Sequence, residues 1–128
     1  MISQRKVAES SITSIKKDSQ QLWIGNRDAE IAALNSTLDK EVSWVPHMFA
    51  IYDIKMHPTL PLMATSSRDK DVKIWSLDDY KLKRSISITK ELPAHQLSVN
   101  KIVWMNEDTL ISVGDDRMVL VWDVQVSI

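Results

Sequence analysis

Two stretches of this sequence decide its fold: residues 63–75 are MATSSRDKDVKIW, and residues 110–122 are LISVGDDRMVLVW. In each stretch a hydroxyl residue stands two positions after the first apolar residue, and an aspartate stands six positions after it. A tryptophan follows six positions later, so that Asp69 is matched with Trp75 and Asp116 with Trp122. The two tryptophans lie 47 positions apart, which indicates an internal repeat.

Each of these two copies has a histidine upstream of its aspartate. His47 precedes Asp69 by 22 positions, and His95 precedes Asp116 by 21. Apolar residues follow each histidine at four and seven positions. One copy of the pattern would be consistent with chance, but two copies with a histidine at the same distance are strong support for a repeat.

A third and weaker copy lies near the N-terminal end. Asp28 and Leu34 keep the spacing of six, but the histidine, the hydroxyl and the tryptophan are replaced in register by Ala8, Ile24 and Leu34. Residues 28–42 also place apolar side chains at helical spacing, which on its own predicts an amphipathic helix. Because the spacing of the clear copies recurs here, a strand is the preferred prediction for this segment.

The length of the repeat indicates the unit that it encodes. A period of 41 to 48 residues fits four short strands joined by turns, which is one blade of a propeller. Residues 71–75 and 118–122 are β-branched runs that follow a turn. Residues 81–88 alternate with basic residues among the outward positions, which is typical of an outer strand, and residues 41–45 are their counterpart one repeat earlier. Residues 3–9 are predicted to form a further outer strand ahead of the first repeat.

These residues resemble the WD40 repeat family. The resemblance is carried by residues 67–75 and 115–123; the second copy ends in Trp122-Asp123, whereas the first ends in Trp75-Ser76. It implies an all-β fold, with three four-stranded antiparallel blades of a partial WD40 β-propeller. The expected blades are residues 1–46, which are degenerate and carry the extra N-terminal strand, residues 47–94, and residues 95–128, which lack their outer strand.

In that family each blade carries a hydrogen-bonded tetrad of histidine, serine or threonine, aspartate and tryptophan. By motif position the resemblance implies two structural tetrads: His47, Thr65, Asp69 and Trp75, and His95, Ser112, Asp116 and Trp122. A buried indole N–H needs an acceptor, and a closed network ties the strands together. A serine, a histidine and an aspartate in contact also suggest a nucleophilic triad. That alternative is disfavoured, because the hydroxyl would lie beneath the tryptophan and the sequence has no glycine-rich oxyanion loop.

Composition excludes several classes of function. The chain has no cysteine, only 3 histidines and 2 glycines, and a net charge of −1. Thiolate metal sites, disulfides, phosphate-binding glycine loops and a general affinity for nucleic acid or membrane are therefore not supported, and no cofactor is predicted. His57 matches no motif and is predicted to be a surface turn residue. The lack of an apolar signal or membrane span predicts a cytoplasmic protein.

Three blades do not close a ring, because natural propellers have about four to eight. Three explanations are open. The chain is the C-terminal part of a larger propeller whose remaining blades belong to another chain or have been lost, it closes with a second copy of itself, or it is a rigid open arc. In a closed ring, the strand expected at residues 3–9 would complete the last blade.

The resemblance implies a non-catalytic scaffold that binds protein or peptide partners through one propeller face. By motif position, the candidates for partner binding are Phe49, Tyr52, Arg68, Leu97, Asn100 and Asp115. Phe49 is expected either to anchor a peptide or to pack between blades. The alternative function is structural: a subunit or fragment that completes a larger propeller, whose other blades carry an enzymatic or ligand site.

Overall fold

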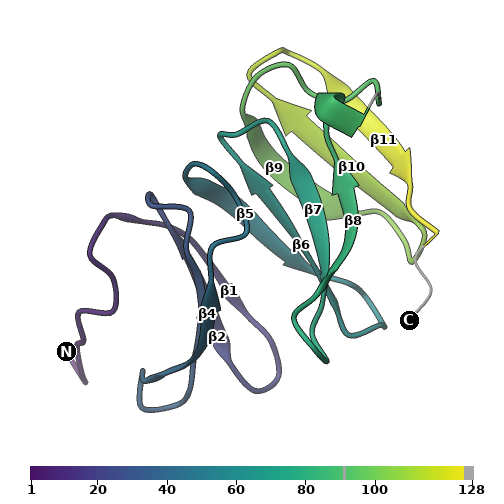
Figure 1. Ribbon diagram of the computed structural model, residues 1–128. Helices are drawn as coiled ribbons and strands as arrows, with labels where there is room; N and C mark the ends of the chain where they lie inside the picture. The colour runs from purple at the N-terminus through teal and green to yellow at the C-terminus, as the bar shows by residue number, and fades with distance from the viewer. Residues whose placement is uncertain (91, 126–128) are drawn as a thin grey trace.

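The computed structural model describes residues 1–90 and 92–125, and its regular structure is almost entirely β (Figure 1). The exception within these ranges is a single 3-10 turn at Ile88–Lys90. The strands are β1 Ile12–Lys17, β2 Leu22–Asn26, β3 Ile31–Leu34, β4 Lys40–Trp44, β5 Ile51–Met56, β6 Leu62–Ser67, β7 Val72–Ser76, β8 Leu82–Ile86, β9 Val99–Trp104, β10 Thr109–Gly114 and β11 Val119–Asp123.

The strands form three antiparallel sheets, each built from strands that follow one another along the chain. The sheets are β1-β2-β3-β4, β5-β6-β7-β8 and, among the described residues, β9-β10-β11; we call them blade one, blade two and blade three. The all-β fold predicted from the repeat is confirmed. Residue 91 of the predicted second blade and residues 126–128 of the predicted third blade lie outside the described residues.

The segment 28–42, which showed helical spacing, contains β3 and the start of β4. All four residues of β3 are buried, because blade two covers one face of this strand and the N-terminal segment covers the other. A strand that is covered on both faces has no polar alternation, so its apolar run imitates the spacing of a helix. The preferred prediction of a strand is confirmed here.

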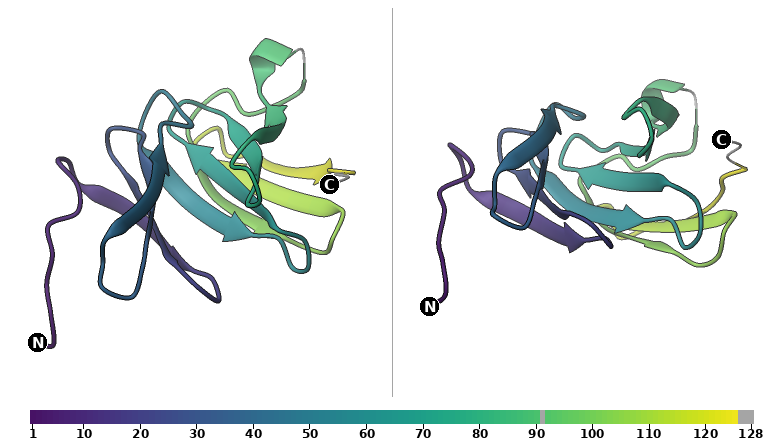
Figure 2. Two further views of the ribbon diagram at one scale, coloured as in Figure 1. Left: turned by 60° about the horizontal axis from the view of Figure 1, so that its bottom comes forward. Right: turned by 90° about the horizontal axis from the view of Figure 1, so that it is seen from below.

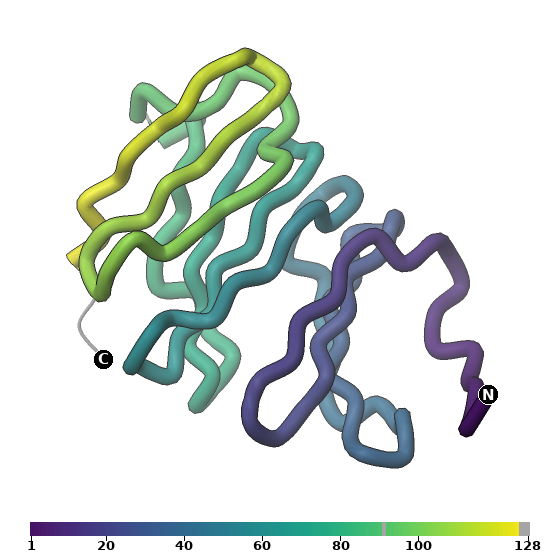
Figure 3. Tube along the Cα trace, turned by 180° about the vertical axis from the view of Figure 1, so that it is seen from behind, coloured from purple at the N-terminus to yellow at the C-terminus, as the bar shows by residue number. Residues whose placement is uncertain are grey.

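The three blades stand side by side in an arc (Figure 1 and Figure 2). The first strand of each blade lies beside that of the next, so that β1 contacts β5 and β5 contacts β9 (Figure 3). This arrangement is that of a partial propeller, in which the first strands form the inner edge.

A hydrophobic core lies between each pair of neighbouring blades. Blades one and two enclose Trp23, Ile31, Ala33, Ile51, Ile54, Met63 and Trp75. Blades two and three enclose Leu62, Ala64, Val72, Ile74, Ile86, Ala94, Val99, Ile102, Leu110 and Val124. Full burial of one large aliphatic side chain contributes about 1.5–3 kcal/mol, so each blade is stabilised mainly by its neighbour.

Polar contacts also join blade two to blade three. The Asp53 carboxylate on β5 accepts a hydrogen bond from the backbone amide of Ile102 on β9, at 3.0 Å. His57 Nε2 donates to the carbonyl of Glu107 at 2.7 Å, and the imidazole lies edge-on to Trp104 with 4.7 Å between ring centroids. His57 is therefore buried, and the prediction of a surface turn residue is wrong, because the β9–β10 turn of the next blade covers it.

The N-terminal segment differs from its prediction. Residues 1–11 contain no strand, so the outer strand predicted at residues 3–9 is wrong for this chain. Instead, Val7 packs against Ile24 and Leu34 on the face of blade one that points away from blade two, and Arg5 forms an ion pair with Asp39 at 2.6 Å. A strand forms by pairing with the free edge of a sheet. This segment lies against a face of blade one, so it has no edge to pair with.

Blade three has one strand fewer than the other blades within the described residues. β11 pairs with β10 along one edge, and no described strand pairs with its other edge. Val119 and Val121 on this strand are 65% and 64% exposed. An unpaired strand edge next to exposed apolar side chains is a place where further β-structure can add.

Candidate functional site

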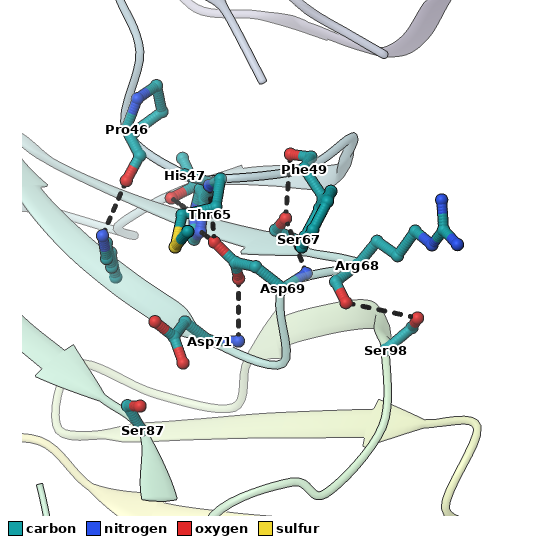
Figure 4. A network of polar contacts seen from close by, with 12 residues as sticks. Pro46, His47, Phe49, Thr65, Ser67, Arg68, Asp69, Asp71, Ser87 and Ser98 are labelled. Carbon is teal, nitrogen blue, oxygen red and sulfur yellow. Dashed lines mark hydrogen bonds and ion pairs between the residues drawn. The ribbon is translucent and has the colours of Figure 1, made fainter. Parts of the chain in front are cut away.

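Blade two brings together the four side chains of its expected tetrad, of which His47, Thr65 and Asp69 are labelled in Figure 4. His47 lies before β5, Thr65 lies on β6, Asp69 lies in the β6–β7 turn, and Trp75 lies on β7. The His47 imidazole contacts Asp69 through Nδ1 at 2.9 Å and Thr65 Oγ1 through Nε2 at 2.8 Å. The indole of Trp75 donates to the same Thr65 oxygen at 3.1 Å.

Blade three repeats this geometry with serine in place of threonine. His95 Nδ1 lies 2.9 Å from an Asp116 oxygen, and its Nε2 lies 2.8 Å from Ser112 Oγ. Trp122 donates from its indole to Ser112 Oγ at 3.0 Å. The two networks use the same atoms in the same order, although matching residues are 47 or 48 positions apart.

One assignment of protons pairs every donor and acceptor in each network. Nδ1–H donates to the aspartate, Nε2 accepts from the hydroxyl, and the hydroxyl accepts from the indole N–H. Both hydroxyls, of Thr65 and Ser112, are fully buried. A hydroxyl with its proton and its lone pair both engaged, and no access to solvent, is a structural link and a poor nucleophile.

The tetrad aspartates are held ionised. Burial opposes ionisation of Asp69, but hydrogen bonds from His47 and from the backbone amides of Met48 and Asp71 outweigh it and lower the pKa of Asp69. Asp116 has the same balance. Burial raises its pKa, and hydrogen bonds from His95 and from the backbone amides of Met118 and Gln96 lower it further than burial raises it.

Blade one has the same turn, but other side chains make its hydrogen bonds. Asn26, two positions before Asp28, caps the turn: its side-chain oxygen accepts from the backbone amides of Asp28 and Glu30 at 3.0 and 3.1 Å. The indole of Trp23 donates to Asp18 in the β1–β2 turn at 2.9 Å. The Asp28 carboxylate is exposed. Asp28 therefore corresponds to Asp69 in sequence position but not in its surroundings.

One backbone feature is common to the three blades. The residue after the turn aspartate has a left-handed conformation in each: Ala29 at φ 69°, Lys70 at φ 80° and Arg117 at φ 66°. Such a conformation costs about 1–2 kcal/mol for a residue with a Cβ. The chain retains it in every blade because the tight turn between the second and third strands requires it.

The candidates for partner binding fall into two groups. Phe49, Tyr52 and Arg68 line one groove between blades one and two, where the Arg68 guanidinium lies 5.7 Å from the centre of the Phe49 ring. Phe49 is 51% exposed, and the rest of its surface is covered where it lines this groove. In blade three, Asn100 donates to Asp115 at 2.6 Å.

Leu97 completes the blade three group as an exposed side chain, 48% accessible, just before β9. The two groups are joined through the backbone of Arg68, whose carbonyl accepts a hydrogen bond from Ser98 at 3.5 Å (Figure 4). Tyr52 and Asn100 lie near the start of the inner strands β5 and β9, and the other four candidates lie in the loops and turns beside these ends.

Three further residues of this face were not among the sequence candidates. Ser11, Thr13 and Arg27 of blade one line the same groove as Phe49. Arg27 had a usable signal, because it directly precedes Asp28 as Arg68 directly precedes Asp69. The first repeat keeps too little of the rest of the pattern for that match to have predicted Arg27 as a binding residue.

In residues 1–90 and 92–125, no three histidine, aspartate or glutamate side chains converge in the way a metal ion would require. The same ranges include no helix with the length and apolar character needed to cross a membrane.

Comparison with known proteins fixes the family. The family profile described as "WD domain, G-beta repeat" matches residues 40–76 and 86–123, which together make up more than half of the chain. The chain belongs to the WD40 repeat family. WD40 repeat proteins are generally non-catalytic scaffolds that mediate protein–protein interactions.

The relatives of this WD40 chain are longer proteins. It is 31% identical over 110 residues to WD repeat-containing protein 37 of Homo sapiens, covering 80% of this chain and 22% of that protein. It is 32% identical over 93 residues to Actin-interacting protein 1 of Caenorhabditis elegans, covering 72% of this chain and 15% of that protein. The chain thus spans about a fifth or less of the length of these relatives.

A solved structure supports the WD40 fold independently. The computationally designed Ika4 protein superimposes with a TM-score of 0.76, over 91% of this chain and 68% of the designed chain. The sequence identity is 19%, so this likeness concerns the fold alone.

Proposed function

We propose that this chain is a non-catalytic scaffold that binds a protein or peptide partner on the face formed by Phe49, Tyr52, Arg68, Leu97, Asn100 and Asp115. The observation that carries the proposal is the exposure of Phe49, which stands beside Arg68 at the mouth of a groove. Aromatic and arginine side chains dominate the binding energy of protein interfaces. The cytoplasmic location of this chain stays a prediction.

The backbone around Phe49 is fixed before any partner arrives. The Ser67 hydroxyl donates to the Phe49 carbonyl at 3.0 Å and accepts from the amide of Asp69 at 3.0 Å (Figure 4). Asp69 is in turn held by the His47 imidazole and by the amide of Met48. A binding surface that is already ordered loses less conformational entropy on association.

The test compares partner capture by three forms of the chain. A double variant, Phe49→Ala with Tyr52→Ala, removes the aromatic surface, and Met105→Ala removes a similarly exposed apolar side chain from the β9–β10 turn as a matched control. We expect the parent chain and Met105→Ala to retain the same proteins from a cell extract, and the double variant to lose them. Equal retention by all three forms would refute this face as the binding surface.

The alternative is that the chain completes a larger propeller, with the remaining blades supplied by another chain or by a second copy. It is favoured by the exposed Val119 and Val121 beside the unpaired edge of β11. The native molar mass by light scattering, with the intact mass of every chain present, tests it. A mass of at least twice 14.7 kDa, lowered by Val121→Asp, supports assembly, whereas a stable monomer excludes it.

A further inference from the structure

The groove between blades one and two has an unusual balance of charge. Its volume is about 350 Å³, and its walls include Ser11, Thr13 and Arg27 from blade one and Phe49, Tyr52 and Arg68 from blade two. Among the residues that the structure describes, no aspartate or glutamate lines it. Two positive side chains therefore converge on one polar cleft in a chain whose net charge is −1.

Neither arginine is neutralised within the described part of the chain. The ion pairs found there involve Arg5, Lys6, Lys40 and Lys55, but not Arg27 or Arg68. A larger hollow, of about 530 Å³, lies between the N-terminal segment and blade one, and its basic side chains are paired with acidic ones. The groove between the blades thus contains two arginines that no ion pair among the described residues neutralises.

The arginines are held by the fold at equivalent positions. The amide of Arg27 donates to the carbonyl of Ser11 at 2.8 Å, and the amide of Arg68 donates to the carbonyl of Ala50 at 3.1 Å. The Arg68 guanidinium also lies over the Phe49 ring, a cation–π contact that limits its mobility. In blade three the equivalent residue is Asp115, whose carboxylate is already bound by Asn100.

We propose that this groove binds an acidic segment of a protein partner, with Arg27 and Arg68 as the two contacts for its anionic oxygens. A guanidinium binds carboxylate or phosphate oxygens through two parallel N–H donors, so an acidic side chain and a phosphoserine supply the same chemistry. The hydroxyls of Ser11 and Tyr52 add donors in the same cleft. This inference rests on the proposed scaffold function and specifies its partner.

The experiment measures binding of short labelled peptides to the full chain by fluorescence anisotropy. The peptides are identical except for a central cluster of glutamates, of phosphoserines or of glutamines. We expect the glutamate peptide, the phosphoserine peptide or both to bind at least about tenfold more tightly than the glutamine peptide. The acidic peptides should lose about tenfold in affinity when Arg27→Gln and Arg68→Gln are combined, and should weaken as salt is raised.

Arg117→Gln is the matched control, because it removes the same charge from an exposed turn of blade three outside the groove. It should leave each affinity unchanged within about twofold. If all peptides bind equally well and the double arginine variant has no effect, the proposal that the chain binds peptides is retained. The proposal that its partner is acidic is then refuted. If acidic peptides bind but only Arg117→Gln weakens them, or if no peptide binds, the assignment to this groove is overturned.

Discussion

Blade one and blade three have the same backbone conformation in one turn, but different side chains stabilise that turn. Both place a left-handed residue after an aspartate in the turn between the second and third strands. In blade three the turn is held by Asp116, which also binds the buried His95. In blade one it is held by Asn26, and Asp28 contributes no hydrogen bond from its carboxylate within the described residues.

The difference shows which parts of a repeat are required and which are replaceable. The distance from turn to strand is fixed by the sheet, because a strand that shifts by one residue exposes its buried side chains. The hydrogen-bonded network is one of several ways to satisfy a turn and an indole. In blade one, Asn26 satisfies the turn and Asp18 satisfies the indole of Trp23.

The largest expected effect separates the two blades directly. Asp116→Ala should destabilise the chain by about 3 kcal/mol, because it leaves the buried His95 and two backbone amides without their acceptor. Asp28→Ala, at the equivalent exposed position, should change the free energy of unfolding by less than about 0.5 kcal/mol. Urea denaturation measures both, and equal losses would remove the distinction between the blades.

A second effect concerns the close approach of Gly25 in blade one to Ile51 in blade two. A Cβ on Gly25 would lie 2.6 Å from Ile51 Cβ and would also meet Ser14, so Gly25→Ala should force blades one and two apart and cost about 2 kcal/mol. Ser66→Ala, at the same register in blade two, is the control. The Ser66 hydroxyl is buried without a partner in the described chain, so its removal should not destabilise.

The stability of the chain should depend on pH through the tetrad aspartates. The pKa values of Asp69 and Asp116 are lower in the folded chain than in the unfolded chain. Their contribution is therefore fully present above pH about 4 and is lost as the pH falls through the lowered values. Asp116→Asn removes one of these groups, and its thermal midpoint should fall less steeply with acid. A curve parallel to that of the parent chain would contradict this account.

The smallest expected effect concerns the left-handed residue that follows the turn aspartate in each blade. Lys70→Gly and Arg117→Gly should each stabilise the chain by roughly 0.5 kcal/mol, since relief of the left-handed conformation exceeds the entropic cost of glycine. Lys81→Gly, at an exposed position without a positive φ, should destabilise it slightly. The shift of the urea midpoint distinguishes the two directions, and losses of stability at both turns would refute a common strained turn.

Much of the fold was predictable because its spacing has a geometric cause. Two strands, the turn between them and the loop before β9 must bring His95, Ser112, Asp116 and Trp122 to one point. The intervals between these residues are therefore nearly invariant, and the structure places their side chains in contact. The blade one substitutions were not predictable. Asn26 and Asp18 act from different positions in the sequence, and nothing in the repeat identifies them.

The two wrong predictions share another cause. The burial of His57 depends on a backbone carbonyl 50 positions away, which has no residue-type signature. The strand expected at residues 3–9 depends on a neighbouring edge, and the sequence of the segment does not specify which surface it will meet. Arg27 is different, since its match with Arg68 was present in the sequence from the start.

The segment matched by the family profile and the four-stranded sheet do not have the same bounds. The profile match at residues 40–76 begins with β4, which pairs with β3 of blade one, and ends with β7 of blade two. A chain cut in the exposed β3–β4 turn, at Ser36 and Thr37, would yield two pieces with complementary strand edges. Such pieces are suited to reassemble without a peptide bond between them, as the halves of a split reporter do.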